Sequence, residues 1–205
     1  FREVFRHRPM IAIPDDHDIG QGNLWGEGGK KAERVQGDDG GYFYHHEYVK
    51  MVERCQTAHL PDPVDPTLVE QGIGVYFTHL KLGSVDFAIV EDRKFKSGPK
   101  GKIPQQGPRP DHIRNPDYDP QSVNVEGLKL LGDRQLAFLE NWGKTNTEDG
   151  TMRAVLSQTG FCGGAHIHGS LDNRLHADMD SNGWPQDGRN KALELIKAAN
   201  AVHIA

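Results

Sequence analysis

The sequence has little cysteine, no long apolar run and no excess of basic charge. Its 205 residues include only Cys55 and Cys162, which can form at most one disulfide and cannot supply a disulfide scaffold. No stretch approaches the ~20 apolar residues of a membrane-spanning helix, and the mean hydropathy is −0.67. The formal net charge is −5, so the sequence lacks the basic signature of a nucleic-acid-binding protein.

Three common site signatures are also missing. The sequence contains no Walker motif, no Gly-x-Gly-x-x-Gly fingerprint and no Gly-x-Ser-x-Gly elbow around Ser157. These absences disfavour a P-loop enzyme, a dehydrogenase and a serine hydrolase. The length fits one domain. Because the chain begins at Phe1 and ends in a strand-like run, we expect residues 1–205 to be the central part of a single larger domain, truncated at both ends.

Short apolar runs alternate with helical patterns along the chain. Five runs of strand length are predicted as buried strands: Met10–Ile13, Ile73–Thr78, Val85–Val90, Arg153–Ser157 and Val202–Ile204. Helices are predicted over Tyr44–Ala58, Asp133–Trp142 and Asp187–Asn200, the last with Asp187 as its N-cap. The alternation predicts an α/β fold. The closeness of the second and third runs favours an antiparallel hairpin, and therefore a mixed sheet.

The strongest candidate site is Asp15–Asp18, which follows the first apolar run. Its three carboxylates in four residues repel one another, and a divalent cation would remove that cost. Carboxylate and imidazole ligands suit Zn, Fe, Mn or Ca. The alternative is a solvated loop in which one Asp caps a helix. The sequence leaves both interpretations open.

Three further segments carry candidate polar chemistry. Arg93 is a candidate bidentate contact for a phosphate group, although a surface ion pair explains it equally well. His166 and His168 have the spacing of metal ligands, which ordinary loops also show. The segment Asp178–Asn182 resembles the start of a calcium loop, but Arg189 stands where such a loop needs Glu. A calcium-binding structural module therefore remains a weaker alternative.

Four segments in order resemble motifs of the PhoD-like alkaline phosphatases, a branch of the calcineurin-like metallophosphoesterases. Ile13–Asp18 resembles the family's Asp-Asp-His-Glu/Asp motif, and Val90–Ser97 resembles Leu-Asp-Thr-Arg-x-Tyr-Arg. Leu131–Leu139 resembles Leu-Gly-x-x-Gln-x-x-Trp-Leu, and Asp180–Arg189 is a variant of Asp-x-Trp-Asp-Gly-Tyr-x-x-x-Arg. The resemblance spans nearly the whole chain.

The resemblance implies a four-layer α/β sandwich, with mixed sheets and helices outside, that hydrolyses small phosphate mono- or diesters. It implies two metal ions, of the iron and calcium or the zinc and manganese type, with Asp16 and Asp15 as ligands. His17 takes the position that donates to the leaving oxygen, and Asp18 orients it. Arg93 becomes a candidate phosphate contact.

The resemblance also implies supporting roles for Asp92 and Asn182, either as substrate contacts or as residues that position the metal ligands. Further metal motifs of the family lie upstream and downstream of this sequence, so we expect the 205-residue piece alone to be inactive and poorly stable. The alternative is a non-catalytic or specialised metal-binding member of the same fold. Export from the cytoplasm is implied by the resemblance alone, and the oligomeric state stays open.

Overall fold

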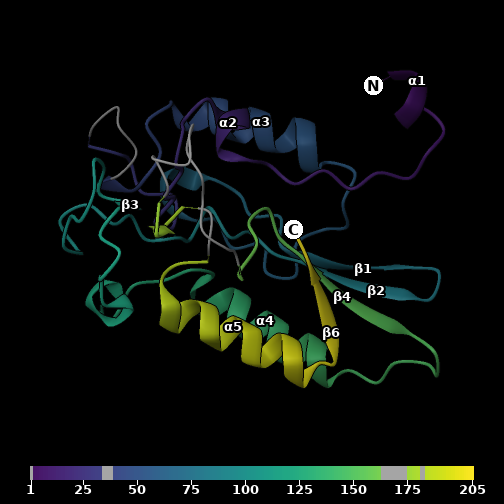
Figure 1. Cartoon of the computed structure of the whole chain (residues 1–205). Coiled ribbons are helices and arrows are strands. Elements are labelled where there is room, and N and C mark those ends of the chain that lie inside the picture. Colours follow the sequence, from purple (N-terminus) through teal and green to yellow (C-terminus); the bar gives the residue numbers. More distant parts are fainter. Residues whose placement is uncertain (1, 34–38, 163–174, 181–182) are drawn as a thin grey trace.

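The described part of the chain combines one mixed sheet with helices and long loops. The computed structural model describes residues 2–33, 39–162, 175–180 and 183–205. Helices α4 and α5 lie along one side of the four-stranded sheet, while α2 and α3 lie apart from them beyond the end of the sheet (Figure 1). The predicted α/β class is therefore confirmed.

The main sheet has the strand order β1-β2-β4-β6. These strands are Thr78–Leu82, Val85–Ile89, Met152–Leu156 and Ala201–Ile204. Strands β1 and β2 form the predicted antiparallel hairpin, whose turn places Gly83 at a φ of 60°, a conformation that glycine adopts without strain. Strands β2, β4 and β6 are parallel, so the sheet is mixed as predicted.

The three predicted helices are confirmed as α3 (His46–Thr57), α4 (Gly132–Lys144) and α5 (Gln186–Ala198). Phe138 and Ile196 are among the residues with which α4 and α5 pack against the sheet, forming one buried apolar cluster with its inner side chains. The prediction that Asp187 caps α5 is wrong, because the N-cap position is Pro185. Asp187 lies in the first turn and accepts a hydrogen bond from Asn124 Nδ2.

Short elements occupy the rest of the described chain. They are α1 (Arg2–Phe5), α2 (Asp16–Ile19), the 3₁₀ turns η2 (Glu70–Gly72) and η3 (Pro120–Val123), and the strands β3 (His112–Ile113) and β5 (Ala177–Asp178). Strands β3 and β5 pair with each other in a separate antiparallel sheet. Two smaller apolar clusters lie outside the main core, one around Trp25 and Trp184, the other around Tyr42 and Val49.

Two strand predictions need correction. Met10–Ile13 belongs to no strand of the described structure, and its side chains are partly or largely exposed. An apolar run forms a strand only if a partner strand lies beside it, and the described residues place none beside Met10–Ile13. Ile73–Thr78 is wrong in its bounds, since the ladder of β1 begins at Thr78. The residues before it are extended, and Ile73 and Phe77 are buried without pairing in the sheet.

The sheet face opposite α4 and α5 is also apolar. Alternate residues of a strand point to opposite faces, and Ala88 and Val155 face the helices. The other face carries the remaining apolar side chains: Leu80, Leu82, Val85, Phe87, Ile89, Met152, Ala154, Leu156, Val202 and Ile204. Leu82, Met152, Val202 and Ile204 are about half exposed. This face therefore leaves apolar side chains partly exposed in the described structure.

The described residues contain two free cysteines and no candidate membrane-spanning helix. Cys55 and Cys162 are both free and exposed, so the single disulfide that the composition allowed is not formed. No helix in the described ranges has the length and hydropathy needed to cross a membrane.

Candidate functional site

Polar side chains gather at the carboxyl ends of β2 and β4. These parallel strands end side by side, with Ile89 paired to Leu156. The buried Asp92 after β2 accepts hydrogen bonds from the backbone N–H groups of Gln158 (3.0 Å) and Thr159 (2.8 Å) after β4. Ligand sites in open α/β sheets lie at this edge, so the position of Asp92 and Arg93 beyond β2 matches the sequence-based expectation.

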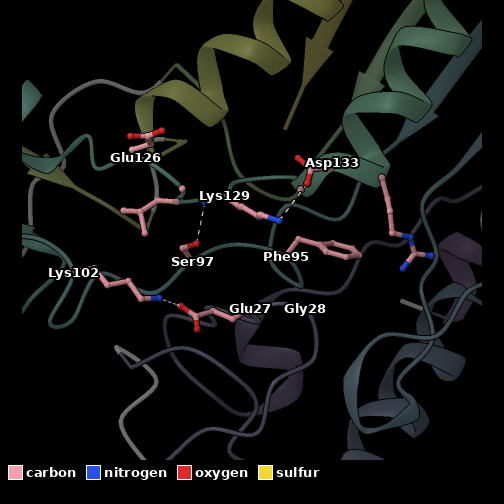
Figure 2. A pocket seen from close by; sticks show the side chains of 12 residues that line it. Glu27, Gly28, Phe95, Ser97, Lys102, Glu126, Lys129 and Asp133 are labelled. Atoms are coloured by element: carbon pink, nitrogen blue, oxygen red, sulfur yellow. Dashed lines mark hydrogen bonds and ion pairs between the residues drawn. The ribbon is translucent and has the colours of Figure 1, made fainter.

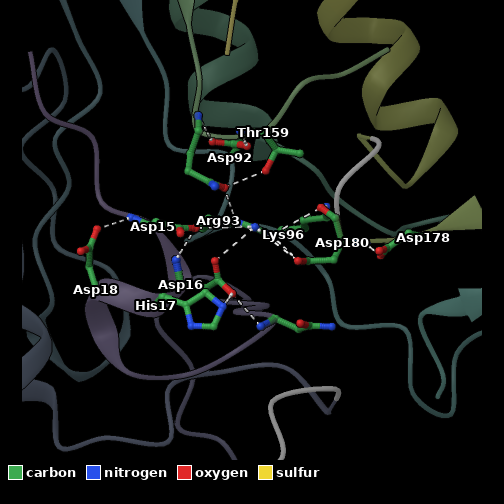
Figure 3. A network of polar contacts seen from close by, with 12 residues as sticks. Asp15, Asp16, His17, Asp18, Asp92, Arg93, Lys96, Thr159, Asp178 and Asp180 are labelled. Carbon is green, nitrogen blue, oxygen red and sulfur yellow. Dashed lines mark hydrogen bonds and ion pairs between the residues drawn. The ribbon is translucent and has the colours of Figure 1, made fainter. Parts of the chain in front are cut away.

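Arg93 is the centre of the polar network (Figure 3). Arg93 is 6% exposed, and its guanidinium donates to Gln158 through Nε and to the Asp180 carboxylate through Nη1. Nη2 has longer contacts, 3.5 Å to Asp16 Oδ1 and 3.9 Å to Asp15 Oδ1. Burial tends to lower the Arg93 pKa, but the carboxylates, Asp180 foremost, outweigh it and raise that pKa. Arg93 therefore stays charged.

Asp16 is the buried carboxylate of the predicted Asp15–Asp18 site, which is called the tetrad below. It begins α2, and its Oδ2 accepts a 2.9 Å hydrogen bond from the backbone N–H of Asn23. Burial would raise its pKa, but Asp15, Arg93 and Asn23 together hold the pKa of Asp16 below its ordinary value of 3.8. The neighbouring Asp15 has a pKa raised to about 6, by burial and then by Asp16. The pair thus joins a carboxylate held ionised to one that titrates near neutral pH.

The tetrad also builds the start of α2, the helix-cap interpretation that the sequence left open. Asp15 is the N-cap, and its backbone N–H donates to Asp18 Oδ2 at 2.9 Å in a capping box. Asp18 is engaged in this contact. The His17 side chain is 82% exposed, and its Nε2 lies 3.8 Å from Asp16 Oδ2. The tetrad therefore offers an accessible imidazole beside a buried carboxylate.

Lys96 and Asp180 belong to the network, although neither was predicted as a site residue. The Lys96 side chain is fully buried, with Nζ donating to the Asp180 carbonyl at 2.9 Å and lying 4.9 Å from the centre of the Trp25 ring. Burial and the charge of Arg93 lower its pKa to about 8. The Asp-x-Asp pattern at 178–180 was the available signal for Asp180. A lysine in a polar segment gave no signal for Lys96.

A second group lies where β3 pairs with β5. Asp111, His112 and Asp178 are all buried, and one potential ligand atom from each lies within 4.8 Å of the others. This is the one group of at least three such ligand residues in the part of the chain that the structure describes. Two carboxylates and an imidazole could hold a metal ion. Asp111 and His112 carry no local sequence signal and were not predicted as site residues.

The described residues do not assemble a third ligand around Asp15 and Asp16, so their metal-ligand role stays a prediction. Asn182, His166 and His168 lie outside the described residues. Asp178 belongs to the group with Asp111 and His112, and the calcium loop predicted through Asn182 extends outside the described ranges. Arg93, which follows β2, contacts two other predicted site residues, Asp15 and Asp16, at the start of α2.

A separate pocket, drawn in Figure 2, is lined by none of the residues of this network. Its volume is about 580 Å³, and Phe95, Ser97 and Arg134 are among its lining residues. Its charges are paired, since Lys102 contacts Glu27 and Lys129 Nζ lies 3.3 Å from Asp133. None of the sequence-predicted site residues lines it. The pocket therefore lacks the excess positive charge expected of a phosphate site.

Among the described residues, the most accessible side chains of the Arg93 network lie at the start of α2. Asp15 and Arg93 border a cavity of only about 10 Å³, roughly the room for one water molecule. Asp15 is 38% exposed and His17 is largely exposed, whereas Arg93 and Asp16 are buried. In the described structure, solvent therefore reaches Asp15 and His17 more readily than the guanidinium of Arg93.

Together, the fold and the polar edge define a mixed α/β protein with an acidic site beyond its parallel strands. No family model matches the sequence, and no curated protein matches it. A solved structure titled "Structure of PhoD" is similar in fold, with a TM-score of 0.53 and 18% sequence identity. The similarity covers 92% of this chain and 32% of that one. The chain has a PhoD-like fold and spans about a third of the length of that protein.

Proposed function

We propose that this chain is part of a metal-dependent hydrolase of phosphoric esters. The observation that carries the proposal is the convergence of Asp16, Arg93 and Asp180 at one sheet edge in a PhoD-like fold. These residues come from three of the four segments that resemble phosphatase motifs. Carboxylates outnumber cationic side chains around Arg93, and such an excess is neutralised by bound cations in phosphoesterase sites.

The proposal assigns each residue a role. Asp16 and Asp15 are metal ligands, and two ions, of the Fe/Ca or Zn/Mn type, are expected in the whole protein. A bound metal would supply a water or hydroxide nucleophile near neutral pH and polarise the phosphate. Arg93 contacts a phosphate oxygen through Nη2, the nitrogen with the longest protein contacts, 3.4 to 3.9 Å.

His17 donates its proton to the leaving oxygen. Its exposure leaves the imidazole free to meet a substrate, and its Nε2 lies 3.8 Å from Asp16 Oδ2. General acid catalysis of this kind contributes about 10²–10⁴-fold. Asp18 supports His17 indirectly, through the capping box that fixes α2. Asp92 holds the loop after β4, and Asn182 is proposed to contact the substrate.

The wider architecture is part of the same proposal. Residues 1–205 form the central portion of a four-layer sandwich, and the apolar sheet face opposite α4 and α5 packs against another layer of the whole protein. The half-exposed Leu82, Met152 and Val202 support this arrangement.

The test compares variants of the full-length protein in phosphomonoester and phosphodiester hydrolysis. We expect Asp16→Ala and His17→Ala each to lower turnover by at least about 100-fold, with folding retained for His17→Ala because its side chain is exposed. His59→Ala is the matched control, since His59 is also an exposed imidazole and lies outside the network. Near-normal turnover of His17→Ala at equal metal content would refute its role.

A further inference from the structure

A short piece of backbone pairing brings together the side chains of Asp111, His112 and Asp178. In the register of β3 and β5, His112 and Asp178 are directly paired. Directly opposed residues of an antiparallel pair have side chains on the same face, with Cβ atoms about 4.5–5.5 Å apart. The Asp111 carbonyl accepts a 2.9 Å hydrogen bond from the Met179 N–H, which ties the two strands together at this point. The group is therefore held by the backbone.

The distances within the group suit a single small cation. Ligand atoms bound to one tetrahedral Zn²⁺ at about 2.0–2.2 Å are about 3.3–3.6 Å apart. The three potential ligand atoms lie within 4.8 Å of one another. A contraction of up to about 1.5 Å would therefore place all three on one ion.

Electrostatics favours a cation at this place. Asp111, His112 and Asp178 are 0%, 8% and 7% exposed, and two carboxylates so close together repel each other strongly away from water. Arg109 Nε lies 3.3 Å from Asp111 Oδ1 and brings one positive charge to the group. A bound cation would add to this compensation of the buried carboxylates.

The ligand chemistry selects the class of ion. Calcium takes six to eight oxygen ligands, whereas imidazole is a ligand of zinc and related transition metals. Three protein ligands that leave a further position open are a recognised zinc arrangement. We propose that Asp111, His112 and Asp178 bind one divalent transition-metal ion of the zinc class. This site is distinct from the Asp15 and Asp16 ligands of the proposed function.

Two bridges connect this site to the Arg93 network. Asn23 donates its backbone N–H to Asp16 and its side-chain amide to Asp111 Oδ2. On the other side, Asp178 Oδ1 accepts a 3.0 Å hydrogen bond from the Asp180 N–H, and Asp180 binds Arg93. An ion here would fix the orientation of Asp111 and Asp178, and through them Asp16 and Arg93.

The test measures zinc binding by the full-length protein after chelator treatment and dialysis. We expect His112→Gln and Asp178→Asn each to bind one zinc equivalent fewer than the wild type, or to bind that equivalent more than about 100-fold more weakly. His79→Gln is the matched control, because His79 lies exposed on β1. Zinc should raise the melting temperature of the wild type and of this control more than that of either ligand variant.

Full retention of zinc number and affinity in both ligand variants would overturn the proposal. The proposal would also be overturned if Asp16→Asn lost this zinc equivalent while His112→Gln retained it, because the ion would then belong to Asp15–Asp18. If the ligand variants do not fold, anomalous diffraction from zinc in wild-type crystals decides. A peak within bonding distance of the three side chains supports the site, and zinc bound only elsewhere refutes it. Hydrolysis plays no part in this test, so either proposal can fail alone.

Discussion

Replacing Arg93 by methionine tests whether the polar network is held together by this one guanidinium. The substitution keeps much of the side-chain volume but removes the charge from between Asp180 and Asp16. Breaking a buried ion pair by removing one partner typically costs about 3–5 kcal/mol, because the other charge is left buried and unpaired. Against a total domain stability of about 5–15 kcal/mol, we expect a large loss at pH 7.

The pH dependence of this loss has a definite sign. In the wild type the pKa of Asp16 is lowered, so its ionised form stabilises the fold above pH 3.8, and this contribution is lost as the pH falls through the lowered pKa. Without Arg93 that pKa rises. The stability difference between the wild type and Arg93→Met should therefore be full at pH 7 and should shrink below about pH 4.

The assay is urea unfolding of the full-length protein, followed by circular dichroism. Lys144→Met is the control, since Lys144 pairs with Glu140 on the exposed surface of α4, where solvent screens such a pair and its contribution to stability is small. A double-mutant cycle with Asp180→Asn should give a coupling energy of about 1–3 kcal/mol. An Arg93→Met loss no larger than that of the control would refute the central position of Arg93.

Three further predictions concern other parts of the structure. The pKa of the buried Lys96 is lowered from 10.5 to about 8, so the unfolded chain binds more protons than the folded chain between these pH values. The stability of the wild type should therefore rise relative to that of Lys96→Met by up to about 3 kcal/mol from pH 7 to 10.5. Parallel pH profiles of the two proteins in urea unfolding would contradict this. Gly26→Ala would place a Cβ 2.4 Å from the Lys94 carbonyl oxygen and should lower the free energy of unfolding by about 1–3 kcal/mol. Gly22 has open space around it, so Gly22→Ala should lower it by less than about 0.5 kcal/mol. Equal melting temperatures of the two variants would argue against the close approach at Gly26. Asp18→Ala removes one half of the capping box of α2 and should cost about 1 kcal/mol in thermal unfolding, and an unchanged melting temperature would show that the cap is dispensable.

The main sheet was predictable because its signals are local. Val85–Ile89 and Met152–Leu156 are apolar runs with buried neighbours, and Gly83 marks the hairpin turn. Met10–Ile13 has the same apolar pattern without a partner strand, and pairing depends on residues far away in the sequence. The bounds of β1 were misjudged for a related reason, because the apolar residues before Thr78 are buried by packing rather than by a ladder.

The position of Arg93 was predictable because it follows β2, and Asp15 and Asp16 lie 3.9 and 3.5 Å from its guanidinium. Asp15–Asp18 was singled out because it follows Met10–Ile13, which is not a strand, and the roles of these residues stay predictions. Lys96 was missed because only the folded chain buries it and places it against Trp25. His112 was missed because its pairing with Asp178 joins two distant loops, and no local pattern encodes that register.

The most direct test of the proposed function is hydrolysis by the full-length protein purified without chelators. Phosphomonoester and phosphodiester substrates would be assayed alongside elemental analysis of bound metal. We predict hydrolysis together with bound metal, and loss of hydrolysis in Asp16→Ala. Stoichiometric metal without hydrolysis of any ester tested, or hydrolysis that survives complete removal of metal, would contradict the assignment as a metal-dependent phosphoesterase.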